Sequence, residues 1–417
     1  MKVAFINATI QEDVPKTTRN IMMAEALHAN NEESIFYTPV RKKRIVTIRR
    51  EGKNQIVSIF LSCWVPFFSR YGVRLENKSI TFRRIIDLME YLVYLTRIQS
   101  RLRRDRVDAY VILHLWDSTI ALLNPILSRF RPVAVLWMGH SLGWYAEFGP
   151  LYHLLVPFYK LVLRKTIILT PIDAEQETCL LKILKLPRKN VFRFNPCIVD
   201  EKLFYEMDKE ECAKIVGFDT KRVNILTMLV IRDPEEIKKS KSSDYQKDVF
   251  RVLEIFRFLV KSNPKAHLHI VGHGPGFEKL KTTISNYGLQ REVSLYGFII
   301  DEARPIFVNA ADLIINPYPL IEINDATAIF EAFLCGKPVV AFKRYSWVPT
   351  EHQGGFLIDI DPQIGAQQLL KRLDPAYLTK KSEEAKTIPY EHYVPMMVWG
   401  KRLSEILVEM LKDKQCR

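Results

Sequence analysis

Short apolar runs alternate with helix-like segments along almost the whole chain, and the alternation restarts near its middle. Strands separated in this way must be joined by crossovers, so they form a parallel sheet whose two faces are covered by helices. The restart predicts two α/β halves in tandem, each with a doubly wound sheet. The clearest apolar runs are VAFINAT (3–9), AYVILHL (109–115), VAVLWMG (133–139) and NILTMLV (224–230).

The predicted boundary between the halves lies near the FRFNPCIVDEKLF segment (192–204), where a strand-like run passes into polar sequence. We therefore expect an N-terminal domain over residues 1–195 and a C-terminal domain over 196–389. The last stretch, 390–417, contains an amphipathic helix that we expect to pack back on the N-terminal domain. A chain of 417 residues is too long for one hydrophobic core, which agrees with two domains.

Cysteine spacing and net charge indicate which compartment and which kind of partner to expect. The six cysteines include no pair at CxxC spacing and the chain opens on an apparent core strand, so reduced thiols in a cytoplasmic protein are expected. Lys and Arg number 61 against 47 Asp and Glu, and the excess of 14 favours anionic partners. Basic residues gather at 41–50, 82–84 and 97–106 among aromatic ones, which indicates either a solvated face or a peripheral contact with an anionic membrane surface. Nucleic acid is disfavoured, because no recognised binding module surrounds them.

A glycine-rich turn separates the strand-like LHIV from the helix-like FEKLKTTI. Gly272, Gly274 and Gly276 permit close backbone approach to a ligand at a helix N-terminus, but a tight strand-to-helix turn also requires glycine. Both interpretations stay open. No GxxxxGK[ST] loop is present in the sequence, which disfavours a P-loop enzyme.

The stretch INPYPLIEINDATAIFEAFLCGKPVVAF (315–342) is the most specific signal for a ligand site. Asp325 suits a helix N-cap, which would leave free backbone N–H groups in the first turn for a phosphate. Glu331 follows about one and a half turns into that helix, where its carboxylate can accept both hydroxyls of a ribose. The candidate binding residues are Glu322, Asp325, Ala326, Thr327, Ala328 and Glu331.

This stretch resembles the signature of the retaining GT-B glycosyltransferases of family 4, the glycosyl transferases group 1. Further landmarks agree in order: NPCIVDEKLF, YQKDVFRVLEIFRFL, IVGHGPGFEKL, VSLYGFI and VNAADLIINPY. The resemblance implies two Rossmann-like α/β/α domains that face each other across a cleft. It also implies retaining transfer of a sugar from a nucleoside-diphosphate sugar to a hydroxyl acceptor, namely a glycan, glycolipid or lipid-linked precursor. Neither a metal nor another cofactor is expected.

The resemblance assigns roles to individual residues. Glu331 would bind the ribose, the backbone over 325–328 would hold the diphosphate or the sugar, and Arg232 and Lys247 would neutralise the leaving diphosphate. His140 would lie near the transferred sugar, although a histidine in a tryptophan-rich loop can also simply pack.

The sequence departs from the family pattern in its acidic spacing and in one charged insertion. Eight residues separate Glu322 from Glu331 where the family has seven, so a bulge restores Glu322, Asp325 replaces it, or the contact is lost. A charged loop carrying Lys238, Lys239 and Lys241 intervenes before Lys247, and these lysines could compete for the phosphate role.

Asp359 and Asp361 form a DxD pattern, which we interpret as a turn before a helix and not as a metal site. Two alternatives to a transferase are a GT-B nucleotide-sugar epimerase or hydrolase, and a catalytically inactive nucleotide-sugar-binding or scaffold protein.

Overall fold

The computed structural model describes residues 1–7, 23, 25–40, 54–60, 98, 102, 104–113, 133–136, 157, 160–161, 163–164, 166–170, 178–194, 198–235, 248–316, 327–342, 354–387 and 394–415. The chain divides into two compact units. Unit 1 comprises Met1–Ile198 together with Val394–Arg417, and unit 2 comprises Val199–Tyr393. The division falls three residues after the predicted boundary at 195, and the C-terminal segment belongs to unit 1.

Unit 1 contains a seven-stranded sheet among its described residues, in the order β3-β2-β1-β4-β5-β6-β7. Each neighbouring pair is parallel, as the alternation of strands and helices predicts. The strands are β1 (Lys2–Asn7), β2 (Glu33–Val40), β3 (Asn54–Phe60), β4 (Ala109–Leu113), β5 (Val133–Leu136), β6 (Ile167–Thr170) and β7 (Val191–Arg193). A π-helical segment (Thr178–Ile183) and a 3-10 turn (Arg188–Asn190) precede β7.

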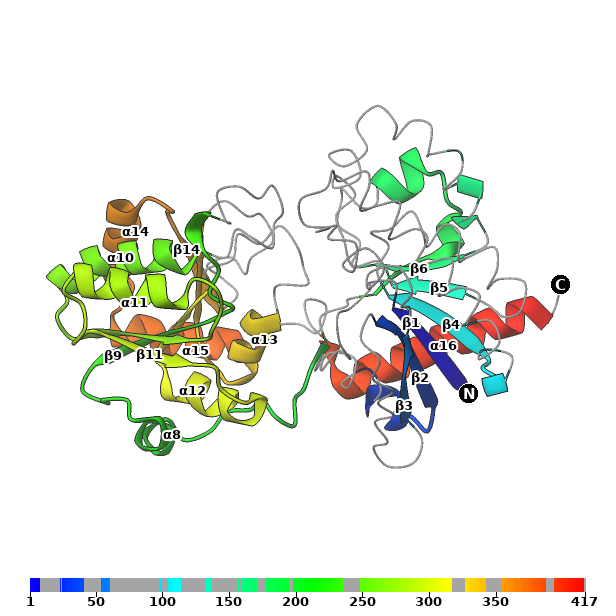
Figure 1. The fold of residues 1–417 in the computed structure, drawn as a ribbon, viewed down its shortest axis with the longest axis horizontal. Coiled ribbons are helices and arrows are strands. Elements are labelled where there is room, and N and C mark those ends of the chain that lie inside the picture. The colour runs from blue at the N-terminus through cyan, green and yellow to red at the C-terminus, as the bar shows by residue number, and fades with distance from the viewer. Residues whose placement is uncertain are drawn as a thin grey trace, which may run out of the picture. The chain divides into compact units, whose positions relative to one another are not determined.

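The long C-terminal helix α16 (Met396–Gln415) packs on the sheet of unit 1 (Figure 1). Its Trp399 is fully buried in a core that contains Val3 and Phe5 of β1 and lies edge-on to Phe194. Gly400 permits this packing, because a Cβ atom there would lie 2.0 Å from the carbonyl oxygen of Ala26. The last segment of the chain therefore completes the core of the first unit.

Unit 2 contains a six-stranded sheet in the order β11-β10-β9-β12-β13-β14, again with parallel neighbours among the described residues. Helices α10, α11 and α14 lie together on one side of it, whereas α8 and α12 lie together on the other (Figure 1). The strands are β9 (Val223–Met228), β10 (Ala266–Val271), β11 (Val293–Gly297), β12 (Leu313–Ile315), β13 (Val339–Phe342) and β14 (Gly355–Ile358). The helices are α8 (Lys209–Val216), α10 (Val249–Ser262), α11 (Phe277–Asn286), α12 (Arg304–Ala310), α13 (Thr327–Leu334), α14 (Pro362–Leu370) and α15 (Pro375–Lys386).

Aspartates begin several of these helices by accepting hydrogen bonds from free N–H groups of the first turn. Asp248 accepts from Arg251 N at 3.1 Å before α10, and Asp374 accepts from Tyr377 N at 3.0 Å before α15. The short strands β8 (Ile198–Val199) and β15 (Val394–Pro395) pair with each other where the chain leaves unit 1 and where it returns.

A row of hydrogen-bonded polar side chains crosses β9, β10 and β11 inside unit 2. His269 lies between Asn224 Oδ1, 2.9 Å from its Nε2, and the Tyr296 hydroxyl, 3.0 Å from its Nδ1. His267 lies one step along, with Ser294 Oγ 2.9 Å from its Nε2 and Arg222 2.8 Å from its Nδ1. We call these side chains the histidine ladder: Arg222, Asn224, His267, His269, Ser294 and Tyr296.

The histidine ladder holds its imidazoles in the neutral form. Burial, assisted by the neighbouring His267 and Arg222, lowers the pKa of His269 to about 3. Burial and Arg222 lower the pKa of His267 to about 4. Phe218 stacks on the His269 ring with centroids 3.5 Å apart, so an apolar face covers the row.

Candidate active site

The carboxyl ends of the parallel strands of unit 2 collect the described candidate residues. In open α/β sheets this edge is where ligands bind. β9 leads into Arg232, β10 leads into the glycine turn, and β12 leads through Asn316 toward α13, which carries Glu331.

The glycine turn packs against the loop that carries Arg232. Gly272 and Gly274 have φ of 142° and 156°, and a Cβ atom on them would lie 1.8 and 2.3 Å from the carbonyl oxygens of Leu229 and Ile231. A Cβ on Gly276 would lie 2.2 Å from the carbonyl oxygen of Arg232. The glycines are therefore needed because the backbones of the two loops touch. This contact accounts for the glycines without a ligand and favours the turn interpretation.

Hydrogen bonds between the two loops fix the position of Arg232. Ile231 N donates to the His273 carbonyl and Gly276 N donates to the Ile231 carbonyl, both at 3.1 Å. Arg232 is partly buried, and these hydrogen bonds hold its backbone in place at the sheet edge. This arrangement holds a cation beside the end of β9.

Glu331 lies in α13 and is 5% exposed. Its Oε2 accepts a hydrogen bond and ion pair from Arg304, the first residue of α12. The guanidinium of Arg304 also lies 3.5 Å from Asp301 and 5.2 Å from the centroid of the Phe204 ring. Arg304 is therefore the charge partner of Glu331, the residue expected to bind the ribose.

Three effects act on the charge of Glu331. Burial raises the pKa of its carboxyl, Arg304 opposes this by lowering it, and Asp301 raises it further, so that the net pKa is raised. A carboxylate that is to accept hydroxyl groups must be ionised at neutral pH. Arg304 favours that state of Glu331.

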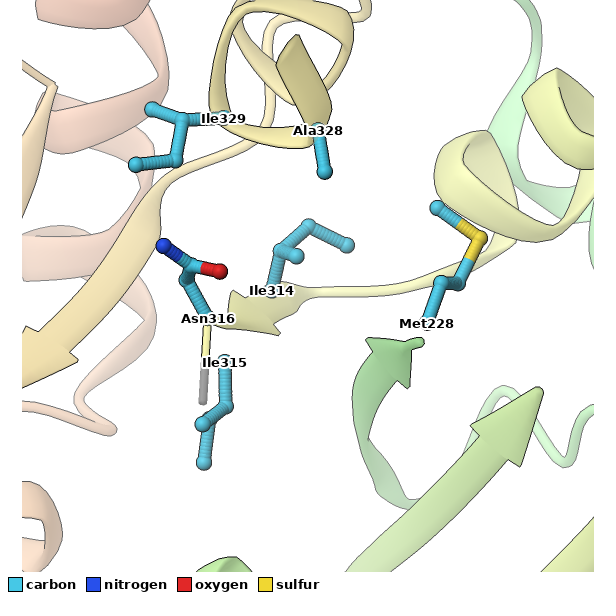
Figure 2. A pocket seen from close by; sticks show the side chains of 6 residues that line it. All are labelled: Met228, Ile314, Ile315, Asn316, Ala328 and Ile329. Carbon is cyan, nitrogen blue, oxygen red and sulfur yellow. The ribbon is translucent and has the colours of Figure 1, made fainter. Parts of the chain in front are cut away.

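A small apolar cavity separates the ends of β9 and β12 from the first turn of α13 (Figure 2). Its volume is about 10 Å³, which is room for a single water-sized group. Ala328, one of the predicted binding residues, lines it at the start of α13. The other lining residues are Met228, Ile314, Ile315, Asn316 and Ile329.

The remaining predicted residues are placed as follows. Thr327 is the first residue of α13. Lys247, His140, Glu322, Asp325 and Ala326 lie outside the described residues, as do Lys238, Lys239 and Lys241. The three alternatives for the first acidic position therefore stay open.

Asp359 and Asp361 have the structural role that the sequence predicts. Asp361 is the N-cap of α14 and accepts from Gln363 N and Ile364 N at 3.0 Å, while Asp359 Oδ1 accepts from Asp361 N at 3.0 Å. Across the described parts of both units, no three His, Cys, Asp or Glu side chains are grouped as a metal site. In the same residues no helix is long and apolar enough to cross a bilayer.

Sequence reasoning missed Arg304 and Asn316. Arg304 lies 27 positions before Glu331, and only the packing of α12 beside α13 brings the two together. Asn316 stands inside the quoted motif, but its burial at the end of β12 depends on the sheet register with β13. The sequence marks Arg304 only as the charged first residue of a largely apolar helix, which does not identify its partner.

Two Rossmann-like units with parallel sheets define the GT-B class of fold, and the comparisons with solved structures agree. Sucrose-phosphate synthase from Thermosynechococcus elongatus superposes with a TM-score of 0.69 at 13% identity, covering 99% of both chains. Anabaena HepE in complex with UDP gives a TM-score of 0.67 at 14% identity, covering 98% of this chain and 100% of that one. At these identities the likeness concerns the fold.

Within that class, residues 231–379 match the family model of Glycosyl transferases group 1. The matched segment contains Arg232, the glycine turn, Arg304 and Glu331, so the predicted resemblance to GT-B glycosyltransferases is confirmed there.

Curated relatives extend the match over part of their own lengths. Mannosylfructose-phosphate synthase of Agrobacterium fabrum is 26% identical over 263 residues, which are 57% of this chain and 54% of that protein. 2-Deoxystreptamine N-acetyl-D-glucosaminyltransferase of Streptomyces fradiae is 27% identical over 129 residues, 31% of this chain and 28% of that protein. The chain thus matches about half of the first relative and less of the second.

Proposed function

We propose that the protein is a glycosyltransferase that moves a sugar from a nucleoside-diphosphate sugar to a hydroxyl acceptor. The observation that carries the proposal is Glu331. It lies in α13 at the carboxyl edge of a parallel sheet, inside the segment that matches Glycosyl transferases group 1. The UDP-bound structure of the similarly folded HepE supports a nucleoside diphosphate as the donor class.

In the proposed reaction, negative charge develops on the diphosphate as it leaves the sugar. Arg232 is a described cation at the sheet edge, and the start of α13 offers N–H groups, so both would stabilise that charge. Lys247 and His140 keep the roles that the resemblance implies. We propose retention at the anomeric carbon without a protein nucleophile, and catalysis by positive side chains in place of a metal.

The acceptor class is proposed from charge. The excess of 14 basic residues, with clusters at 41–50 and 97–106, suits a glycan, glycolipid or lipid-linked acceptor at an anionic membrane surface on the cytoplasmic side. Sedimentation with anionic liposomes should then weaken when Arg41, Lys42, Lys43 and Arg44 are neutralised. Unchanged sedimentation would remove the membrane part of the proposal and leave the rest intact.

The deciding experiment is a screen of UDP-, GDP- and ADP-sugars for thermal stabilisation, followed by donor turnover with the best ligand. A ligand at a hundred times its Kd adds about 2.7 kcal/mol to the unfolding free energy, which a melting experiment detects easily. We expect Glu331→Ala to weaken both stabilisation and turnover by at least about tenfold, because a carboxylate contact to ribose is lost.

Glu254→Ala is the matched control, because Glu254 is a partly exposed residue of α10 whose carboxylate pairs with Arg251 at 2.7 Å. It should behave like the parent. Binding without any turnover would favour the inactive binding protein, and turnover to an isomerised or hydrolysed sugar alone would favour the epimerase or hydrolase. A parent protein that binds no nucleotide sugar would refute the proposal.

A further inference from the structure

Asn316 is buried, and among the described residues its side chain has no hydrogen-bond partner. It follows β12 directly and is 3% exposed, and neither its Nδ2 nor its Oδ1 has a partner within the part of the chain that the structure describes. Its backbone N–H donates to the Val340 carbonyl at 2.9 Å.

Asn309, fully buried in the neighbouring helix α12, shows what a structural asparagine looks like in this unit. Its Oδ1 accepts from Met207 N, and its Nδ2 donates to the carbonyls of Tyr205 and Pro305, all at 3.0 Å. A buried carboxamide without such partners is destabilising, so an apolar residue would suit the Asn316 position better if packing alone decided.

The described surroundings of Asn316 are apolar, and they include the first turn of α13. Its carboxamide faces the cavity between β12 and α13, together with Ile314, Ala328 and Ile329 (Figure 2). The cavity of about 10 Å³ has room for one oxygen-sized group, not for a sugar ring.

The cavity adjoins the beginning of α13, the eight-residue helix that also carries Glu331. The first N–H groups of a helix have no partners within the helix and favour an anionic or polar oxygen. Asn316 therefore places an unpartnered donor and acceptor next to the backbone groups that most favour a ligand oxygen. Uncompensated buried polar groups in native proteins concentrate at functional sites.

We propose that the Asn316 carboxamide hydrogen-bonds an oxygen of the bound donor, either of the diphosphate or of a sugar hydroxyl. Asn316 is then a further substrate-binding residue. This inference rests on the proposed function, and it adds a contact that neither the motif spacing nor the family resemblance assigns. Its contribution to binding offsets a cost in the stability of the free protein.

The test is Asn316→Leu, which keeps the size of the side chain and removes both polar atoms. Chemical unfolding without ligand should give a stability equal to or above that of the parent. Affinity for the best nucleoside-diphosphate sugar should fall at least about tenfold, as expected for one lost hydrogen bond to a charged or strongly polar group. Equal weakening of the free nucleoside diphosphate indicates a diphosphate contact, whereas weakening of the sugar-bearing donor alone indicates a hydroxyl contact.

Asn309→Leu is the matched control and should show the opposite pattern, with lower stability and parental affinity in the folded fraction. Two results would overturn the inference. If Asn316→Leu is destabilised, the carboxamide is used by the protein itself, whatever happens to affinity. If it is stable and binds like the parent, no donor oxygen depends on Asn316.

The experiment separates this inference from the proposed function. A parent that binds donor, a Glu331→Ala variant that does not, and an Asn316→Leu variant that binds normally would overturn only the role of Asn316. A parent that binds no nucleoside diphosphate or its sugar, or a Glu331→Ala variant that binds like the parent, would overturn the nucleotide site and the Asn316 contact with it.

Discussion

The histidine ladder and the edge of the sheet beside α13 both hold buried or partly buried polar side chains, but they differ in how their polar atoms are satisfied. In the ladder both ring nitrogens of His267 and of His269 have a partner within 3.0 Å. At the edge, the Asn316 side chain has none in the described part of the chain, and Glu331 depends on Arg304.

Within one domain, this difference distinguishes polar groups that stabilise the fold from polar groups that are available to a ligand. A fully paired network fixes one arrangement of strands and gains nothing from a ligand. An incompletely paired edge costs stability until something binds. Stability measurements should therefore respond to changes in the ladder, and ligand measurements should respond to changes at the edge.

The largest effect is expected from acid, which breaks the ladder. The folded pKa of His269 is about 3 against 6.5 in the unfolded chain, so between these values the unfolded chain binds more protons. The unfolding free energy contributed by His269 is complete above pH 6.5 and falls as pH decreases, by about 3 kcal/mol at about pH 4.5. Urea unfolding across this range measures it. Glu331 changes the unfolding free energy with pH in the opposite direction, because its pKa is raised in the folded protein.

His269→Leu isolates the contribution of His269 to the unfolding free energy. The variant should lose about 2 to 3 kcal/mol at neutral pH, because Asn224 Oδ1 and the Tyr296 hydroxyl lose their shared partner. It should also lose less stability than the parent on acidification, while donor affinity in the folded fraction stays unchanged. An acid dependence identical to that of the parent would show that His269 is not the titrating group.

A smaller effect is expected from Arg304→Met, which tests the edge. Without the guanidinium that lowers it, the pKa of the buried Glu331 carboxyl should rise further, so that the protonated form gains weight. Donor affinity should fall about tenfold, and the loss should shrink as pH rises and the carboxyl ionises again. Isothermal titration across pH measures the ratio of variant to parent Kd.

Arg304→Lys retains the charge and serves as the control, with a smaller loss and a pH profile close to that of the parent. The charged groups that act on Glu331 are Arg304, the first residue of α12, and Asp301, in the turn that precedes α12. A ratio of Kd values that stays constant with pH would contradict the role of Arg304 in keeping Glu331 ionised and would leave it a packing role.

Much of the fold could be predicted from the sequence, because it depends on local patterns. The apolar runs at 109–115 and 224–230 became the parallel strands β4 and β9, and Asp361 caps a helix as expected. These features need only periodicity and capping chemistry, which act over a few residues.

The candidate site was less predictable, because its contacts join distant positions. The sequence identified Glu331 but gave no sign that Arg304 would contact it, and Asn316 looked like part of an ordinary strand end. The glycine turn allowed two interpretations until the carbonyl groups of the neighbouring loop were located. Such contacts are set by the packing of helices and by strand order, which pattern analysis does not reach.

The return of α16 to unit 1 has a consequence for synthesis. Unit 2 is one continuous segment, Val199–Tyr393, so all of its strands leave the ribosome before Trp399 does. Unit 1 begins first, but its core lacks Trp399 and Leu403 until the segment that follows unit 2 is made. The second unit can therefore finish folding before the first, reversing the usual N-to-C order, and the unfinished sheet of unit 1 must stay free of aggregation while it waits.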